Sequence, residues 1–215
     1  MIEYPKIETP FERDTDGTKK LIEGKWRREA FDYLENNLWI CTEKVDGTNI
    51  SIEWDGHKVS YHGRTENAQI PAHLMNRLID LFGGETNEQL FEQKFGEMPV
   101  ILYGEGYGPK IQKGGGLYSD EPDFILFDVY LPDKNLWLSR HSVEDIAISF
   151  GIDAVPIVLI GSLKDAIEHV KKKPVSDVGK REAPMEGLVC RPLVELTDRL
   201  GKRVIVKIKV RDFAD

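Results

Sequence analysis

Two lysines near the end of the chain stand where a phosphate group could bind. Lys207 and Lys209 lie two residues apart in a segment of alternating residues that predicts a β-strand. Both side chains then project from one face of that strand, where like charges repel unless an anion lies between them. A phosphate would satisfy both lysines. A solvent-exposed sheet edge explains the same pair without any ligand.

A third lysine could act as a nucleophile. Lys44 lies on a short connection between two predicted strands and is followed by Asp46 and Gly47. A lysine amine attacks only when it is neutral, a state that desolvation and nearby cations favour. The two C-terminal lysines or a metal ion could supply such cations. By itself, a lysine in such a turn is an ordinary surface residue.

Two glutamates precede glycines at predicted strand ends. Glu105 is followed by Gly106, and Glu186 by Gly187. Glycine lets a ligand or another backbone approach closely, and a carboxylate can accept a sugar hydroxyl or bind a divalent cation. Other reaction classes have no support, because the sequence contains no Walker loop, no dinucleotide fingerprint in a βαβ unit, no Gly-x-Ser-x-Gly elbow and no histidines at metal-ligand spacing.

Charge is distributed unevenly along the chain. The 215 residues carry a formal net charge of -8, but residues 164–215 hold 13 basic and 9 acidic residues, so the rest of the chain is strongly acidic. The segment from Arg199 to Arg211 contains six basic residues and no acid. This pattern argues against charge-driven coating of a nucleic acid and permits a focused phosphate site.

Cysteine content and hydropathy predict a cytoplasmic protein. Cys41 and Cys190 are too few for a disulfide scaffold, and we expect both to be small buried residues. The first residues lack the basic and apolar regions of a secretory signal. No stretch approaches eighteen consecutive apolar residues, so we expect no membrane contact.

The hydrophobic pattern predicts an α+β fold with largely antiparallel sheets and helices on the outside. Apolar runs bounded by turn residues predict nine strands, at Trp39–Thr42, Ile50–Trp54, Lys58–Tyr61, Pro99–Tyr103, Phe124–Tyr130, Leu136–Leu138, Val155–Ile160, Glu186–Arg191 and Val204–Val210. Helical spacing predicts two helices within residues 71–95, one over Ser142–Phe150, and one that Ser162 caps and that ends before Pro174. Residues 10–28 are polar, and we expect them to be irregular.

These pieces occur in the order of the motifs of the covalent nucleotidyltransferases, the superfamily of ATP-dependent ligases and mRNA capping enzymes. Lys44-Val45-Asp46-Gly47 resembles their KxDG signature, which is a weak match by itself. The later motifs follow in order at strand-like positions, and this order makes the joint resemblance specific. They are Gly63-Arg64-Thr65, Tyr103-Gly104-Glu105, Phe127-Asp128, Glu186-Gly187-Leu188-Val189 and Lys207-Ile208-Lys209. The resemblance spans about residues 40–212.

Within the superfamily, the residues around the signature resemble the RNA ligase 2-like group. Thr48-Asn49 follows the glycine, where DNA ligases typically carry an arginine two residues on. Asp46 is a departure, because some RNA ligase 2-like enzymes have histidine there. The chain stops soon after Lys209, so residues 1–215 resemble a single minimal nucleotidyltransferase (adenylylation) domain with no C-terminal OB-fold. The implied fold is α+β, an ATP-grasp-like ligase adenylylation domain.

The resemblance implies an ATP-dependent RNA ligase that uses Mg²⁺ or Mn²⁺. Lys44 would attack the α-phosphorus of ATP and form a covalent lysyl-AMP. The AMP would then pass to a 5′-phosphate RNA end, and a 3′-hydroxyl would displace it. The implied partners are ATP and RNA ends or a nicked RNA-containing duplex, and another protein could replace the missing C-terminal domain.

The resemblance also implies a role for each motif residue. The residues expected to be catalytic are Lys44, Asp46, Glu186, Lys207 and Lys209, with Glu186 also expected at the metal. The nucleotide would be bound by Glu43, Lys44, Asn49, Arg64, Glu105, Phe127, Glu186, Lys207 and Lys209. In this scheme the lysines hold the α-phosphate, Glu105 contacts ribose, and Phe127 stacks on adenine. Asp128 is a weaker candidate, because it could simply end its strand.

Three other functions stay open from the sequence. The chain could be a minimal ATP-dependent DNA ligase, which nick sealing on all-DNA and RNA-containing duplexes would separate from an RNA ligase. It could be a non-catalytic nucleotide- or nucleic-acid-binding module of the same fold, although the intact set of Lys44, Glu186, Lys207 and Lys209 argues against lost chemistry. It could also be an ordinary α+β binding domain with accidental motifs, which would form no covalent adduct with ATP.

Overall fold

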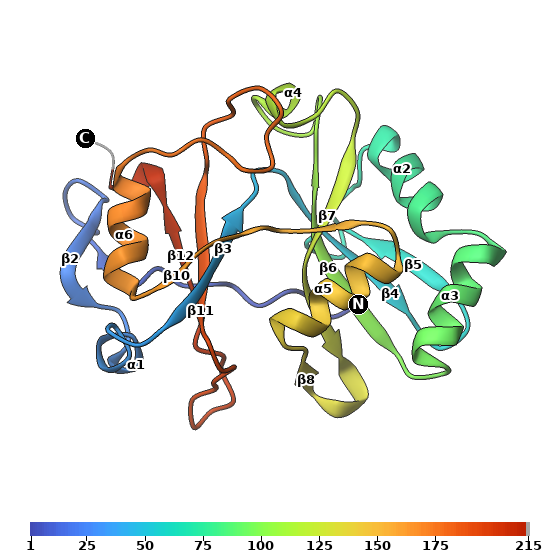
Figure 1. The fold of residues 1–215 in the computed structure, drawn as a ribbon, viewed down its shortest axis with the longest axis horizontal. Helices are drawn as coiled ribbons and strands as arrows, with labels where there is room; N and C mark the ends of the chain where they lie inside the picture. Colours follow the sequence, from blue (N-terminus) through green and yellow to red (C-terminus); the bar gives the residue numbers. More distant parts are fainter. Residues whose placement is uncertain (214–215) are drawn as a thin grey trace. The chain divides into compact units, whose positions relative to one another are not determined.

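The computed structural model describes residues 1–213 and separates into two compact units (Figure 1). Unit 1 contains Met1–Tyr4 and Asp46–Val155. Unit 2 contains Pro5–Val45 and the described residues from Pro156 on. Antiparallel pairing dominates the sheets of both units, which confirms the predicted α+β class.

A six-stranded sheet forms the centre of unit 1. Its main path runs in the order β5-β4-β6-β7-β8 with antiparallel pairing, and β9 pairs with β7 in parallel. The bounds are β4 (Thr48–Trp54), β5 (Val59–His62), β6 (Val100–Tyr107), β7 (Asp123–Leu131), β8 (Leu136–Trp137) and β9 (Asp153–Ala154). All of the strands predicted between residues 50 and 138 are therefore confirmed, with small differences at their ends.

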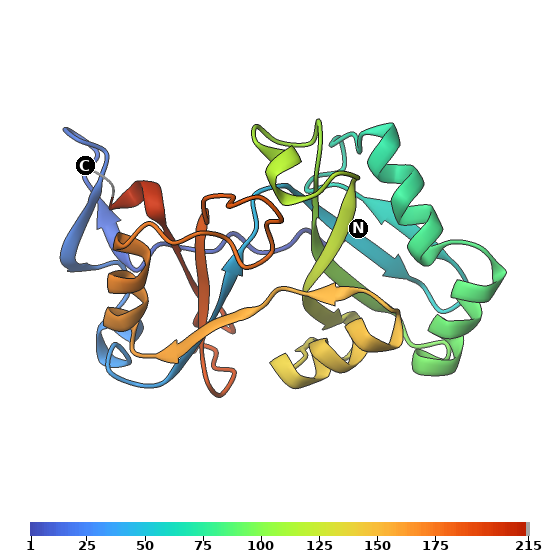
Figure 2. The same cartoon turned by 45° about the horizontal axis from the view of Figure 1, so that its top comes forward.

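Helices cover one face of this sheet, as the helical spacing predicts (Figure 2). They are α2 (Ala72–Phe82), α3 (Glu85–Phe95) and α5 (Arg140–Ser149). Alternate residues of the strands, such as Ile50, Ile52 and Leu102, pack against these helices in one apolar core. The residues between them, including Asn49 and Glu105, therefore belong to the opposite face. Short elements complete the unit: α4 (Gly115–Tyr118) and the 3₁₀ turn η1 (Pro132–Lys134).

Unit 2 is built on a four-stranded antiparallel sheet in the order β10-β3-β11-β12. The strands are β3 (Trp39–Lys44), β10 (Ile157–Gly161), β11 (Gly187–Pro192) and β12 (Val206–Lys209). Figure 1 shows how this order places blue β3 beside the orange β11, although the two are far apart in sequence. The 3₁₀ turn η2 (Val210–Asp212) follows β12, so the last strand is shorter than predicted.

Helix α6 (Leu163–Lys171) packs on one face of the unit 2 sheet. It begins at a capping box, in which Ser162 accepts from the Asp165 amide and Asp165 accepts from the Ser162 amide. Its apolar side meets alternate strand residues in a core that contains Trp39, Cys41, Leu188, Cys190, Val206 and Ile208. The predicted alternation of the last strand is confirmed within β12. Both cysteines are free and buried, as expected.

Residues 10–28 are not irregular, and that prediction is wrong. Strands β1 (Phe11–Arg13) and β2 (Leu21–Trp26) form an antiparallel hairpin, and α1 (Glu29–Tyr33) follows. The rings of Phe11 and Trp26 lie 4.6 Å apart, and Leu21 is buried beside them. Residues 22–25 of β2 are all exposed, so the strand carries no alternation of buried and exposed positions.

Within residues 1–213, no helix is long and apolar enough to cross a membrane.

Candidate active site

Lys44 and Lys209 lie close together in the unit 2 sheet, one on each side of Gly187. Gly187 of β11 lies opposite Lys44 on β3 and opposite Lys209 on β12. Directly opposed residues of antiparallel strands point to the same face, so both lysines project from the face away from α6. Lys207 shares this face, because it lies two residues before Lys209 and opposite Val189.

The carboxylate of Glu186 joins two of these lysines. Nζ of Lys44 is 2.5 Å from Oε2, and Nζ of Lys209 is 2.5 Å from Oε1. Burial by itself would raise the pKa of Glu186, but the charges and hydrogen bonds of Lys44 and Lys209 together outweigh burial and hold that pKa below its ordinary value. Glu186 is therefore ionised at neutral pH, with one oxygen directed to each lysine.

Only glycine fits between the strands that carry these lysines. A Cβ atom at Gly187 would lie 2.1 Å from the carbonyl oxygen of Ile208 and 2.8 Å from Cα of Lys209. The close approach expected at this glycine is thus made by the backbone of β12. Gly187 keeps β11 and β12 close enough for Glu186 to reach Lys209.

Glu43 points away from this group. It precedes Lys44 on β3, so its side chain lies on the face of α6, where it is 1% exposed. Its carboxylate accepts hydrogen bonds from the Ser176 hydroxyl, from the Asp177 amide at 2.8 Å and from the Val178 amide at 3.3 Å. Burial raises the pKa of Glu43 despite these donors. The side chain therefore anchors the loop at 176–178, and its expected contact with a nucleotide finds no support in this geometry.

A second group of predicted residues lies in unit 1. Asn49 of β4 is directly opposite Glu105 of β6, so the two side chains are neighbours on the face without helices. The glycine of the KxDG motif lies close by, because a Cβ atom at Gly47 would come 2.2 Å from the carbonyl oxygen of Gly106. Gln112 donates a 2.5 Å hydrogen bond to the Gly47 carbonyl. Asp46, at the start of this turn, is half-buried.

Phe127 and Asp128 lie at an irregularity of β7. The pairing with β6 changes from Tyr103 opposite Asp128 to Gly104 opposite Leu126, so β7 has one extra residue at Phe127. Such bulges redirect side chains locally. The ring of Phe127 is half-buried, whereas Asp128 is fully buried and accepts a hydrogen bond from Tyr4.

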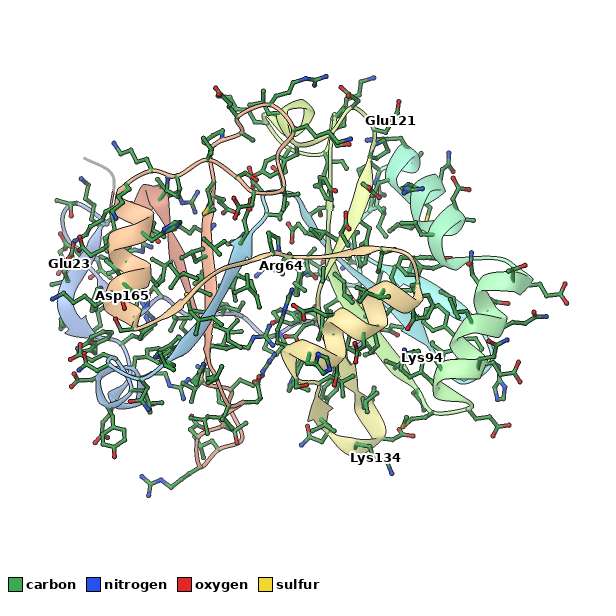
Figure 3. All side chains as sticks on the ribbon, viewed as in Figure 1. Glu23, Arg64, Lys94, Glu121, Lys134 and Asp165 are labelled. Atoms are coloured by element: carbon green, nitrogen blue, oxygen red, sulfur yellow. The ribbon has the colours of Figure 1, made fainter. Side chains whose placement is uncertain are left out.

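Arg64 lies in unit 1, on the segment that follows β5, and its side chain is exposed (Figure 3). The structure thus brings the predicted residues together in two sets. Unit 2 holds Lys44, Glu186, Lys207 and Lys209 on one sheet face, and unit 1 holds Asp46, Asn49, Arg64, Glu105, Phe127 and Asp128.

A family model described as RNA ligase matches residues 37–209. The chain belongs to the RNA ligase family. The match includes every residue that we predicted for the site from sequence.

Solved structures of an RNA ligase from Naegleria gruberi share the nucleotidyltransferase fold of this family member. A variant of that protein with ATP and Mn has a TM-score of 0.62 and 19% identity, and the match covers 96% of this chain and 62% of that chain. The same protein with PPi has a TM-score of 0.62 and 22% identity, with 96% and 61% covered. Another variant, with AMP and Mn, has a TM-score of 0.64 and 19% identity, with 95% and 61% covered. This chain therefore spans about three fifths of the Naegleria chains. No curated protein matches the chain.

Three residues that contact the predicted set had no sequence signal of their own. Tyr4 bonds Asp128 across 124 positions, Ser176 bonds Glu43 across 133, and Gln112 bonds Gly47 across 65. None of the three lies in a recognised motif or an alternating pattern. Only their contacts in the folded chain of this RNA ligase family member identify them.

Proposed function

We propose that this protein is an ATP-dependent RNA ligase that joins 5′-phosphate and 3′-hydroxyl RNA ends through a covalent lysyl-AMP. The observation that carries the proposal is the group in which Glu186 joins Lys44 and Lys209 on the face that Lys207 shares. A primary amine, two further cationic side chains and a carboxylate are the groups that transfer of a nucleotide to lysine requires. Membership of the RNA ligase family supports the same reaction.

In the first step, Lys44 acts as the nucleophile. Its Nζ must lose a proton and its contact with Glu186, because an ion-paired ammonium group has no lone pair to donate. The amine then attacks the α-phosphorus of ATP, so that an N–P bond forms, the P–O bond to the leaving group breaks, and pyrophosphate departs. Lys207 and Lys209 bind oxygens of the α-phosphate and offset the charge that develops there.

The other predicted residues bind the rest of the nucleotide in this proposal. Phe127 stacks on adenine, and Glu105 accepts hydrogen bonds from the ribose hydroxyls. Asn49, as the neighbour of Glu105, contacts ribose or phosphate. The exposed Arg64 binds a phosphate of ATP or of the RNA end. Asp46 orients the turn that carries the nucleophile.

The next two steps transfer the activated phosphate between RNA ends. The 5′-phosphate of one end attacks the lysyl-AMP phosphorus, the N–P bond breaks, and AMP is joined to the RNA through a pyrophosphate linkage. The 3′-hydroxyl of the other end then attacks the RNA phosphorus, a phosphodiester forms, and AMP leaves. Both steps depend on positioning and on charge stabilisation by the same lysines.

Mg²⁺ or Mn²⁺ fits beside Glu186 in the lysine group, which consists of Lys44, Glu186, Lys207 and Lys209. The Naegleria ligase was solved with ATP and Mn and with AMP and Mn, which supports ATP and a divalent cation for this chain. Among residues 1–213, no group of three or more histidine, cysteine, aspartate or glutamate side chains could hold a metal. Mg²⁺ often binds through one carboxylate and substrate phosphates, and Glu186 suits that role. The cation would neutralise phosphate charge during transfer.

We also infer that residues 1–215 act as one nucleotidyltransferase domain. Because the chain spans only 61–62% of the Naegleria chains, a further domain or a separate partner is expected to help bind the RNA ends or the nicked duplex.

Intact-protein mass spectrometry after incubation with ATP and Mg²⁺ tests the proposal. We expect a mass increase of one AMP in the wild type and none in Lys44→Arg, which keeps a cation beside Glu186 but lacks the nucleophilic amine. Lys44→Ala removes both properties and serves as a second variant, with circular dichroism to check its fold. Lys134→Ala is the matched control, because that lysine is exposed on η1.

Nick sealing then identifies the polynucleotide. We expect faster sealing of a 5′-phosphate nick in an RNA-containing duplex than in all-DNA. Preference for all-DNA would indicate a DNA ligase, and an adduct with GTP alone would indicate capping chemistry. A folded wild type that carries no AMP beforehand and forms no adduct would refute the proposal in favour of a binding module.

A further inference from the structure

The first residues of the chain lie against the face of the unit 1 sheet that carries no helices. Tyr103 on β6 donates a 2.7 Å hydrogen bond from its hydroxyl to the carbonyl of Ile2. The amide of Ile2 donates in turn to Oε1 of Glu53 on β4 at 3.2 Å. Two strands of the sheet therefore fix the backbone of this segment, which determines where Tyr4 lies.

Tyr4 contacts both residues of the bulge in β7. Its hydroxyl donates a 2.8 Å hydrogen bond to Oδ2 of Asp128. Its ring lies 5.0 Å from the ring of Phe127 at an interplanar angle of 77°, an edge-to-face contact. One side chain thus holds the buried carboxylate and the half-buried aromatic ring of the bulge at the same time.

Other aromatic rings hold Tyr4 itself in place. Its ring centroid is 5.0 Å from that of Tyr103 and 5.4 Å from that of Trp137, both with edge-to-face geometry. Tyr103 is 1% exposed, so it provides a fixed support. A side chain that is packed on several sides is rigid and can restrain the residues it contacts. Residues that support a binding site must act in this way.

We propose that Tyr4 is a positioning residue of the nucleotide site, which holds the β7 bulge in the conformation that presents Phe127 to the base of ATP. The inference rests on the proposed function, in which Phe127 stacks on adenine. A bulge interrupts the regular pairing with β6, so the ladder alone does not fix the orientation of Phe127. The contacts of Tyr4 with Phe127 and Asp128 supply that restraint.

This role predicts a specific kinetic change. Tyr4 contacts Phe127, the residue proposed to bind the base, so its loss should weaken ATP binding and leave the attack by Lys44 unchanged. Tyr4→Ala is expected to raise the KM for ATP in adduct formation about tenfold, which corresponds to about 1.4 kcal/mol. The rate at saturating ATP should stay within about twofold of wild type.

The experiment measures lysyl-AMP formation against ATP concentration in four proteins: wild type, Tyr4→Ala, Tyr4→Phe and Tyr33→Ala. Tyr4→Phe keeps the ring contacts and loses only the bond to Asp128, so we expect a rise in KM of about threefold. It also serves as the test if Tyr4→Ala does not fold. Tyr33 is 85% exposed on α1, so Tyr33→Ala should behave as wild type.

Each outcome decides between positioning and its alternatives. A higher KM with an unchanged saturating rate supports the inference. An unchanged KM, or a lower saturating rate without a change in KM, overturns it and assigns Tyr4 to the fold alone. A lower KM also overturns it, because Tyr4 would then obstruct the base. If wild type forms the adduct, a failure here leaves the proposed function intact, whereas a wild type without adduct refutes both.

Discussion

The ion pairs of Glu186 can be tested without any substrate. We expect Glu186→Gln to destabilise the folded protein at neutral pH, because glutamine has nearly the same shape but no charge. Lys44 and Lys209 would then lie side by side with no carboxylate between them. The loss should appear in the free energy of unfolding, measured in urea.

The expected magnitude follows from the two contacts. A hydrogen bond to a charged group contributes about 1.5–3 kcal/mol. The side chains of Lys44 and Lys209 are 24% and 14% exposed, so each can recover part of its hydration when the carboxylate is replaced. We therefore expect about 2–3 kcal/mol in total for Glu186→Gln at pH 7, which is at or below the low end of the sum of two such contacts.

The pH dependence separates charge from packing. The pKa of Glu186 is lowered in the folded protein from its ordinary value of 4.5, so the stability it contributes is fully present above that value. That contribution is lost as the pH falls through the folded pKa, when wild type also becomes neutral at this position. The difference between wild type and Glu186→Gln should therefore shrink below pH 4.5. The raised pKa of Glu43 acts in the opposite direction, but equally in both proteins.

A control variant and a double mutant separate the ion pairs of Glu186 from its packing. Glu121→Gln changes an exposed glutamate on the segment before β7, and it should leave the unfolding free energy nearly unchanged at every pH. Lys209→Met removes one of the two partners, so Glu186→Gln should cost less in that background. A destabilisation that is the same at pH 7 and pH 4, or that is fully additive with Lys209→Met, would show that Glu186 acts through packing and that the ion pairs contribute little.

Two further substitutions test the structural roles of Gly187 and Glu43. Gly187→Ala should destabilise the fold by about 2 kcal/mol, because its Cβ would lie 2.1 Å from the backbone of Ile208; an unchanged urea midpoint would mean that β12 can move aside. Glu43→Ala should cost about 3 kcal/mol and speed protease cleavage within 176–182, because it leaves the Ser176 hydroxyl and two amides without their acceptor. Cleavage at the wild-type rate would contradict the anchoring role of Glu43.

The sequence predicts which face of a strand a side chain occupies, because that depends only on local periodicity. A strand has a period of two, so the alternation around Lys207 and Lys209 was enough to assign both lysines to one face. The same rule places Glu43 and Lys44 on opposite faces of β3, and the motif resemblance led us to group them instead. The contact of Glu43 with the nucleotide, expected from the motif resemblance, therefore stays a prediction that the strand period does not favour.

Contacts between distant segments could not be predicted in this way. Phe11 and Leu21 become buried only because β1 and β2 fold against the unit 2 core, and the run of exposed residues in β2 hides that pairing. Tyr4 reaches Asp128 across 124 residues of chain. No local propensity records such an approach, since it depends on the course of the whole backbone.

The motif glycines illustrate why a motif can be recognised before its physical reason is known. The sequence suggested that Gly187 admits a ligand or another backbone, and the structure places Gly187 against the carbonyl of Ile208 and Gly47 against that of Gly106. In each case the glycine lets a neighbouring strand approach, and the functional residue stands next to it. For Glu186, that approach sets the position of the carboxylate between two lysines. Strand packing therefore requires the glycine next to the functional residue. The chemistry depends on that glycine only through the position of the neighbouring side chain.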